Sequence, residues 1–267
     1  PMLTLDPDMA DLVSRALADL GVDLRLGSAV TSFGTTDGHV RSVETDQGSF
    51  DADLVVVGLG VRPNTGLAVA AGVPIGPSGG IAVDERMHTE VDGIWAAGDC
   101  VESFHRVSGQ RVVIALGTHA NKQGRVAGTN IGGGSATFGG VVGTAITRVG
   151  SAEVARTGLT EREAVAAGRD AVAVVSTGPS RARYLPGSEP MTVKLVVDAA
   201  DRRLLGGQIV GGDGAGLRID ILATALWNGM TVDEVAGMDL AYAPPFSPVW
   251  DPVLVAAGKA VLRLDRP

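Results

Sequence analysis

The stretch that most constrains this chain runs from Thr89 to Cys100 and reads Thr-Glu-Val-Asp-Gly-Ile-Trp-Ala-Ala-Gly-Asp-Cys. Residues 93–97 are small and apolar apart from one tryptophan, which is typical of a short buried strand. Gly98 and Asp99 end that strand. A glycine lets a ligand approach the backbone closely, and an aspartate at the carboxyl end of a strand can accept hydrogen bonds from hydroxyl groups. An ordinary strand and turn of an α/β protein accounts for the spacing equally well.

A helix is expected after this strand, from Ala115 to Asn130, with its first turn near residues 116–118. The N-terminus of a helix offers free N–H groups and the positive end of the helix dipole. A flavin would suit this arrangement, because the carboxylate can bind ribityl hydroxyls and the adjacent N-terminus of the helix can face an electron-rich ring. The residues predicted to bind this cofactor here are Gly98, Asp99, Ala115, Leu116, Gly117 and Thr118.

The pattern closely resembles the second FAD motif of the pyridine nucleotide–disulfide oxidoreductases. That motif has a threonine, an apolar pair, an alanine, any residue, a glycine and an aspartate, which here are Thr89, Ile94, Trp95, Ala96, Gly98 and Asp99. The resemblance implies that Asp99 binds the ribityl chain of FAD. It also implies that the following helix points its N-terminus at the flavin ring.

Two further segments carry the same resemblance. Residues 51–64 resemble the segment that leaves the NAD(P)H domain and returns to the FAD domain, and Gly60 within it is expected at the cofactor. Residues 242–247, Tyr-Ala-Pro-Pro-Phe-Ser, resemble the dimerisation domain of the coenzyme A-disulfide reductase and NADH oxidase branch. The resemblance implies a homodimer in which Tyr242 and Tyr184 reach the partner's flavin and active cysteine. A phenol there could donate a hydrogen bond to a developing thiolate, whereas packing at an interface is the alternative role.

The order of elements predicts an α/β fold, part of a protein with two dinucleotide-binding domains, followed by an α+β dimerisation domain with an antiparallel sheet. Three domains are expected: the second half of an NAD(P)H-binding domain (1–62), a C-terminal segment of an FAD-binding domain (63–134) and a dimerisation domain (135–267). Leu54 to Val57 is an unbroken apolar run, as in a strand buried on both faces. Alternation from Met191 to Asp198 instead predicts a strand with one buried face, in a sheet with helices on one side. Shorter local patterns predict a hairpin around residues 46–48, a strand at residues 81–84, capping boxes that begin at Thr160 and Thr231, and a last helix that begins at Ser247-Pro248.

Composition excludes several classes of protein. The net charge of −8 disfavours a nucleic-acid partner, and the longest apolar stretches are too short to cross a membrane. A single cysteine favours a reducing, cytoplasmic setting, and no signal peptide is expected. The four histidines lack metal-binding spacing, so no metal is predicted. Scattered cations, among them Lys194 and Arg218, are expected to form a solvated face.

No G-x-G-x-x-G pattern occurs, so both pyrophosphate-binding loops are missing from this sequence. The chain is therefore expected to be the C-terminal part of a longer FAD-dependent enzyme, and to be inactive alone. That parent would pass hydride from NAD(P)H through flavin to a small-molecule acceptor: a disulfide, persulfide, peroxide or oxygen. Cys100 is expected to be structural, because no cation near it in the sequence would lower its pKa. The alternative is a non-catalytic homodimerisation module without flavin.

Overall fold

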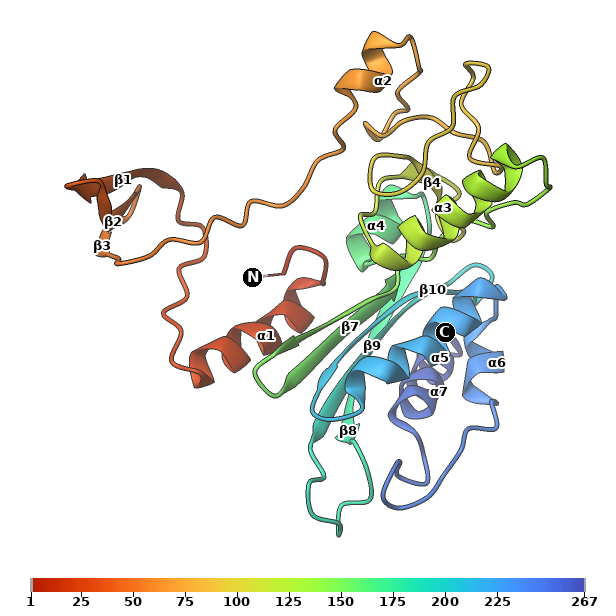
Figure 1. The fold of residues 1–267 in the computed structure, drawn as a ribbon. Helices are drawn as coiled ribbons and strands as arrows, with labels where there is room; N and C mark the ends of the chain where they lie inside the picture. Colours follow the sequence, from red (N-terminus) through yellow and green to blue (C-terminus); the bar gives the residue numbers. More distant parts are fainter. Residues whose placement is uncertain (1, 267) are drawn as a thin grey trace.

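The computed structural model describes residues 2–266, and its largest element is a five-stranded antiparallel sheet (Figure 1). The strand order across it is β6-β7-β10-β9-β8. The strands are β6 (Ala145–Val149), β7 (Ala152–Gly158), β8 (Ala171–Pro179), β9 (Pro190–Asp198) and β10 (Leu204–Gly211). The predicted antiparallel sheet is confirmed, and β7 is a strand that the sequence pattern did not predict.

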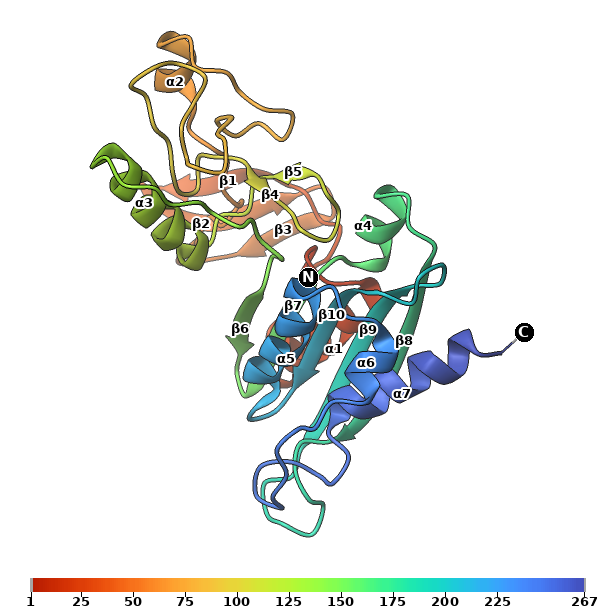
Figure 2. The same ribbon diagram turned by 90° about the vertical axis from the view of Figure 1, so that its right-hand side faces the viewer.

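One face of this sheet is covered by three helices, which Figure 2 shows side by side: α5 (Ala215–Trp227), α6 (Val232–Ala236) and α7 (Pro252–Leu264). The side chains at alternate positions of β9 enter the core beneath them, together with Ile219 and Leu222 of α5 and Val253 of α7. This core explains why β9 carries apolar residues at every second position, since a strand presents successive side chains to opposite faces.

The opposite face is also covered, which corrects the expectation of helices on one side only. α1 (Pro7–Asp19) packs Met9 and Val13 against Val154 of β7 and Val210 of β10. α4 (Glu161–Ala166) packs against Val196 on the same face through Ala164. All residues of β9 from Met191 to Asp198 are therefore buried, although their alternation predicted one buried face. The helices on this second face come from segments remote in sequence from β9, so the local pattern of β9 does not predict them.

A smaller unit lies beyond one end of the sheet and contains α2 (Gly66–Ala70), β4 (Ser103–Phe104), β5 (Arg111–Val112) and α3 (Gly117–Ile131). Its core joins Val73, Ile81, Val83, Met87 and Val101 to Val126 and Ala127 of α3. The strands predicted at residues 81–84 and 93–97 are wrong: only isolated bridges form there, from Ile81 to Ile75 and to Val101, and from Trp95 to His88. Among the described residues, neither segment forms a ladder of more than isolated bridges.

The first part of the chain forms a three-stranded antiparallel sheet of β1 (Val30–Thr36), β2 (His39–Thr45) and β3 (Gly48–Asp51). The hairpin predicted around residues 46–48 is confirmed by the β2–β3 pairing. The buried strand predicted at Leu54 to Val57 is wrong. Leu54 and Val56 are 75% and 85% exposed, and no described residue pairs with the segment. A strand of this composition needs neighbours on both edges and both faces.

The ends of the helices follow local sequence rules more closely than the strands do. Thr160 and Thr231 both form the predicted capping boxes with the glutamates three residues later. α7 begins at Asp251, whose side chain accepts from the Val253 N–H, and not at the predicted Ser247-Pro248. Within residues 2–266, no helix combines the length and the apolar character that a membrane crossing requires.

Candidate flavin-facing site

Thr89 closes the turn that leads into the motif. Its hydroxyl donates to the Ile94 carbonyl oxygen at 2.9 Å and accepts from the Val91 N–H at 3.2 Å. The side chain is buried, and the Thr89 N–H also donates to the Ile94 carbonyl. The motif threonine is therefore a local organiser that sets the direction of residues 95–99.

Gly98 brings the end of the motif against α3. Its φ of +92° lies in the left-handed region, where a side chain would be strained. A Cβ at this position would lie 3.7 Å from the Ala120 Cβ, so the backbone passes close to the first turns of α3. Asp99 follows directly, and its carboxylate is exposed. The structure thus brings a free carboxylate to the beginning of α3.

The N-terminus of α3 has no side-chain cap. Its N-cap residue is Leu116, whose side chain has no acceptor, and no acidic residue lies in the first turn. Gly117 and Thr118 are exposed, and the first backbone bonds of the helix are donated by His119 and Ala120. The N–H groups of Gly117 and Thr118 therefore have no backbone acceptor in the described structure, and the positive end of the dipole is open to an electron-rich group.

His119 lies half-buried in this first turn. Burial lowers the pKa of its imidazole. The hydrogen bond with the Ile114 carbonyl and the charge of Asp99 raise the pKa, whereas Lys122 lowers it, and the result stays below the ordinary value of 6.5. The ring is therefore neutral at pH 7. Nδ1 lies 3.4 Å from the Ile114 carbonyl oxygen, which can only accept, so Nδ1 carries the proton and Nε2 is an acceptor.

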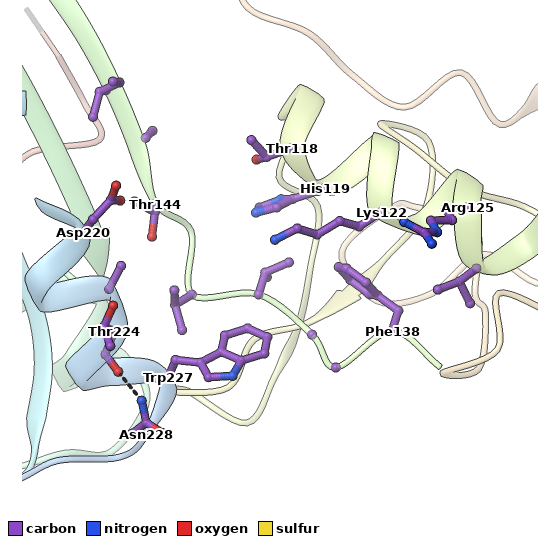
Figure 3. Close-up of a pocket in the computed structure, with 18 of the residues that line it drawn as sticks. Thr118, His119, Lys122, Arg125, Phe138, Thr144, Asp220, Thr224, Trp227 and Asn228 are labelled. Carbon is purple, nitrogen blue, oxygen red and sulfur yellow. Dashed lines mark hydrogen bonds between the residues drawn. The ribbon is translucent and has the colours of Figure 1, made fainter. Parts of the chain in front are cut away.

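A cavity of about 900 Å³ opens between α3 and α5 (Figure 3). His119, Lys122 and Arg125 line it from α3, and Asp220 and Trp227 face them from α5. Thr118 is the one residue of the predicted flavin group in its lining. The predicted site therefore lies at the edge of this cavity.

Tyr184 belongs to the loop after β8, and Tyr242 belongs to the loop before α7. Both loops lie at the other end of the molecule from α3 (Figures 1 and 2). The two loops are joined, because the Ala182 N–H donates to the Pro244 carbonyl at 3.2 Å. Tyr184 is 77% exposed and Tyr242 is 49% exposed. The structure thus brings the tyrosine loops together, but it does not bring them to Asp99 of the same chain.

Arg218 holds the loop that carries Tyr242. Its guanidinium donates to the Asp251 carboxylate at 2.9 Å and to the carbonyl oxygens of Phe246 and Ser180. Asp251 is buried and accepts a further bond from Ser247. The expectation of a solvated cation is wrong for Arg218, because the guanidinium satisfies the carbonyls of both tyrosine loops.

Gly60 lies in the exposed segment between β3 and α2, with φ of +81°. No hydrogen bond among the described residues joins it to Asp99 or to α3. Its place in a cofactor site stays a prediction.

Residues 1–124 match the family described as pyridine nucleotide-disulphide oxidoreductase. Residues 144–252 match the dimerisation domain of the same family. The chain belongs to this family. The family motifs predicted from residues 89–99 and 242–247 lie within these two ranges, so the predicted resemblance is confirmed.

Named relatives and a solved structure place the chain more closely. It is 42% identical over 254 residues to "NAD(P)H sulfur oxidoreductase (CoA-dependent)" of Pyrococcus furiosus, covering 95% of this chain and 57% of that protein. It is 36% identical to "NADH oxidase" of Methanocaldococcus jannaschii, covering 98% of this chain and 58% of that protein. The structure of a "NAD-Dependent Persulfide Reductase from A. fulgidus" superposes with a TM-score of 0.94 at 42% identity, over 98% of this chain and 49% of that one. The chain thus spans about half the length of these proteins, from 49% to 58%.

Sequence reasoning missed the buried polar residues that hold these parts together. Lys194 is 2% exposed and was expected in solvent. Gln123 is 1% exposed, and the sequence pattern assigns it no role. A glutamine on the apolar side of a helix was the available signal, because such a side chain must find hydrogen-bond partners inside the protein.

Proposed function

We propose that this chain is the C-terminal part of an FAD-dependent NAD(P)H oxidoreductase. The observation that carries the proposal is the exposed carboxylate of Asp99, held by the Gly98 turn beside the uncapped N-terminus of α3. This donor set fits a flavin, because a carboxylate accepts from ribityl hydroxyls while free N–H groups face an electron-rich ring. FAD would supply a two-electron carrier between NAD(P)H and a disulfide, persulfide, peroxide or oxygen.

In this proposal, each residue near the N-terminus of α3 has a separate role toward the cofactor. Asp99 binds the ribityl chain, and the N–H groups of Gly117 and Thr118 face the ring, with Ala115 and Leu116 shaping the approach. Gly60 lies where the chain passes back toward the cofactor. His119, neutral at pH 7, presents an acceptor nitrogen beside this group.

The proposal that further residues complete the enzyme rests on two observations. The sequence has no G-x-G-x-x-G loop for either pyrophosphate, and the chain spans 57% of the sulfur oxidoreductase. Without the charge-assisted contacts to a pyrophosphate, the 267-residue chain alone is expected to hold little flavin and to be inactive. A non-catalytic dimerisation module is the alternative function.

The test is to produce the protein with the residues that flank this chain in its gene and to measure three quantities. A flavin absorbance that survives gel filtration, bleaching of that absorbance by NADH or NADPH under anaerobic conditions, and recovery on adding one of the four acceptors are expected. A colourless protein with unchanged dimer mass would favour the non-catalytic alternative.

We infer that the tyrosine loops form a homodimer interface. Five large side chains of these loops are exposed by 49–78%: Tyr184, Tyr242, Phe246, Val249 and Trp250. Several large side chains exposed together on two joined loops are typical of an interaction surface. Since the loops lie away from Asp99 of their own chain, a partner copy is the route by which Tyr242 and Tyr184 reach a flavin site.

Changing both Phe246 and Trp250 to aspartate is expected to convert the chain from a dimer to a monomer. The charges would have to be buried in an interface of more than ~2,000 Å², and an unpaired buried charge is costly. Light scattering at micromolar concentration gives the mass. Leu67→Asp on α2, where Leu67 is 87% exposed, is the control and should remain dimeric. A dimer that survives the double change would contradict this interface.

Tyr242→Phe in the complete enzyme is expected to lower turnover by about tenfold or more while flavin content stays constant. The change removes the hydroxyl and keeps the ring with its packing. If the hydroxyl stabilises charge in the transition state, its loss appears in kcat. Steady-state rates at matched flavin occupancy give the result, and equal turnover would leave Tyr242 a role only in the interface.

A further inference from the structure

Gln123 is a buried amide that connects three segments of the site. Its Oε1 accepts from the Gly98 N–H at 2.8 Å, and its Nε2 donates to the Ser103 hydroxyl at 2.8 Å. Gln123 is 1% exposed and Ser103 is 4% exposed. One side chain on α3 therefore ties the Gly98 turn and β4 to the helix.

The bond to Gly98 acts on the residue before Asp99. Gly98 has φ of +92°, a conformation that leaves its N–H pointing out of any regular ladder, and Gln123 supplies the acceptor. The other contact of this turn with α3 is the close approach of Gly98 to Ala120. That contact is van der Waals packing and has no direction, whereas a hydrogen bond fixes both distance and angle. The amide therefore sets the orientation of the peptide that carries Asp99.

The surroundings of Gln123 leave no substitute partner. The buried side of α3 consists of Gln123, Val126, Ala127 and Asn130, and the two apolar members belong to the core of this unit. An apolar side chain at position 123 would leave the partly buried Gly98 N–H and the buried Ser103 hydroxyl without their partner. A buried donor without a partner moves toward water, which here means that the turn moves away from α3.

We propose that Gln123 is a positioning residue for the cofactor: it acts through Asp99 by fixing the carboxylate relative to the N-terminus of α3. The effect on flavin rests on the proposed function. The effect on the Gly98 turn rests on the hydrogen bonds of Gln123. Flavin retention then depends on Gln123, although this side chain is buried against Gly98 and Ser103 and is not itself aimed at the cofactor site.

The test compares Gln123→Leu with Asn130→Leu in the complete enzyme. Asn130 is the matched control, because it is buried on the same face of α3 and its side chain makes four hydrogen bonds, with Arg86 and Ala136, at the far end of the helix. Both variants should lose thermal stability. Gln123→Leu alone is expected to release flavin faster, by about tenfold, as measured by the rise in free-flavin fluorescence on dilution.

Amide hydrogen exchange at Gly98 gives a second readout that needs no flavin. Gln123→Leu is expected to speed this exchange, whereas Asn130→Leu leaves it unchanged. Gln123→Glu keeps an acceptor for the Gly98 N–H, and the Ser103 hydroxyl can turn to donate to it. This variant should therefore keep the slow exchange at Gly98 and retain flavin better than Gln123→Leu.

Equal flavin release and equal Gly98 exchange in the two leucine variants would overturn the inference. A wild-type enzyme without flavin would overturn the proposed function, and the Gly98 exchange rates would still decide whether Gln123 holds the turn. Fast exchange with unchanged flavin release would also overturn the inference, because the turn would then move without consequence for the cofactor.

Discussion

Lys194→Met is expected to destabilise the dimerisation domain by about 3–5 kcal/mol, because it removes one partner from a buried ion cluster. The Lys194 ammonium lies 2.7 Å from Oδ1 of Asp8 and 3.3 Å from Oδ2 of Asp6, and it also contacts the Glu161 carboxylate. Asp6 is itself 3% exposed, so its charge cannot turn to solvent once the ammonium is gone. The cost is that of leaving this carboxylate buried without a cation.

The same cluster attaches α1 to the sheet. Gln208 of β10 donates to the Asp6 carboxylate at 2.6 Å and accepts from the Asp6 N–H at 2.8 Å. Burial lowers the pKa of Lys194, but the hydrogen bonds to Asp8 and Glu161 outweigh this and raise it above 10.5. The stabilisation is therefore complete at pH 7 and is lost only as the pH rises through that folded-state pKa.

Urea unfolding followed by tryptophan fluorescence measures this effect, since two of the three tryptophans, Trp227 and Trp250, lie in residues 144–252, which match the dimerisation domain. Lys259→Met is the control: Lys259 is exposed on α7, and its substitution should change the unfolding free energy by less than about 0.5 kcal/mol. Equal midpoints for the two variants would show that the cluster contributes nothing to stability.

Asp99→Ala in the complete enzyme is expected to weaken flavin binding by about 10- to 100-fold, or about 1.5–3 kcal/mol, the value of a hydrogen bond to a charged group. The carboxylate is exposed and stands beside the N-terminus of α3, so in the proposed site its removal would leave the ribityl hydroxyls without an acceptor. The fold should be unaffected, because the described structure assigns the Asp99 side chain no hydrogen bond within the chain.

Fluorescence titration of the apoenzyme with FAD gives the two dissociation constants. Asp92→Ala is the control, because Asp92 is an exposed aspartate in the preceding turn, seven positions earlier, and its loss should leave affinity unchanged. An unchanged Kd for Asp99→Ala would remove this residue from the cofactor site, whereas equal losses in both variants would indicate a general effect of charge.

The sequence alone determined the features that depend on neighbouring residues. The capping boxes at Thr160 and Thr231, the hairpin at residues 46–48 and the start of α3 near Leu116 all follow from spacings of a few residues. The motif from Thr89 to Asp99 identified the family for the same reason, because Thr89 organises its own turn through bonds to Val91 and Ile94.

Only the tertiary structure decided where polar groups are buried and which predicted strands form. Lys194 meets Asp6 and Asp8 across more than 180 positions of sequence, and its burial follows from α1 docking on the sheet. The apolar run at residues 54–57 is intrinsically suited to a strand, yet it remains exposed because the described residues offer it no ladder partner. Burial and strand pairing depend on which other segments pack against a residue. A local sequence pattern therefore indicates only which secondary structures a segment is able to form.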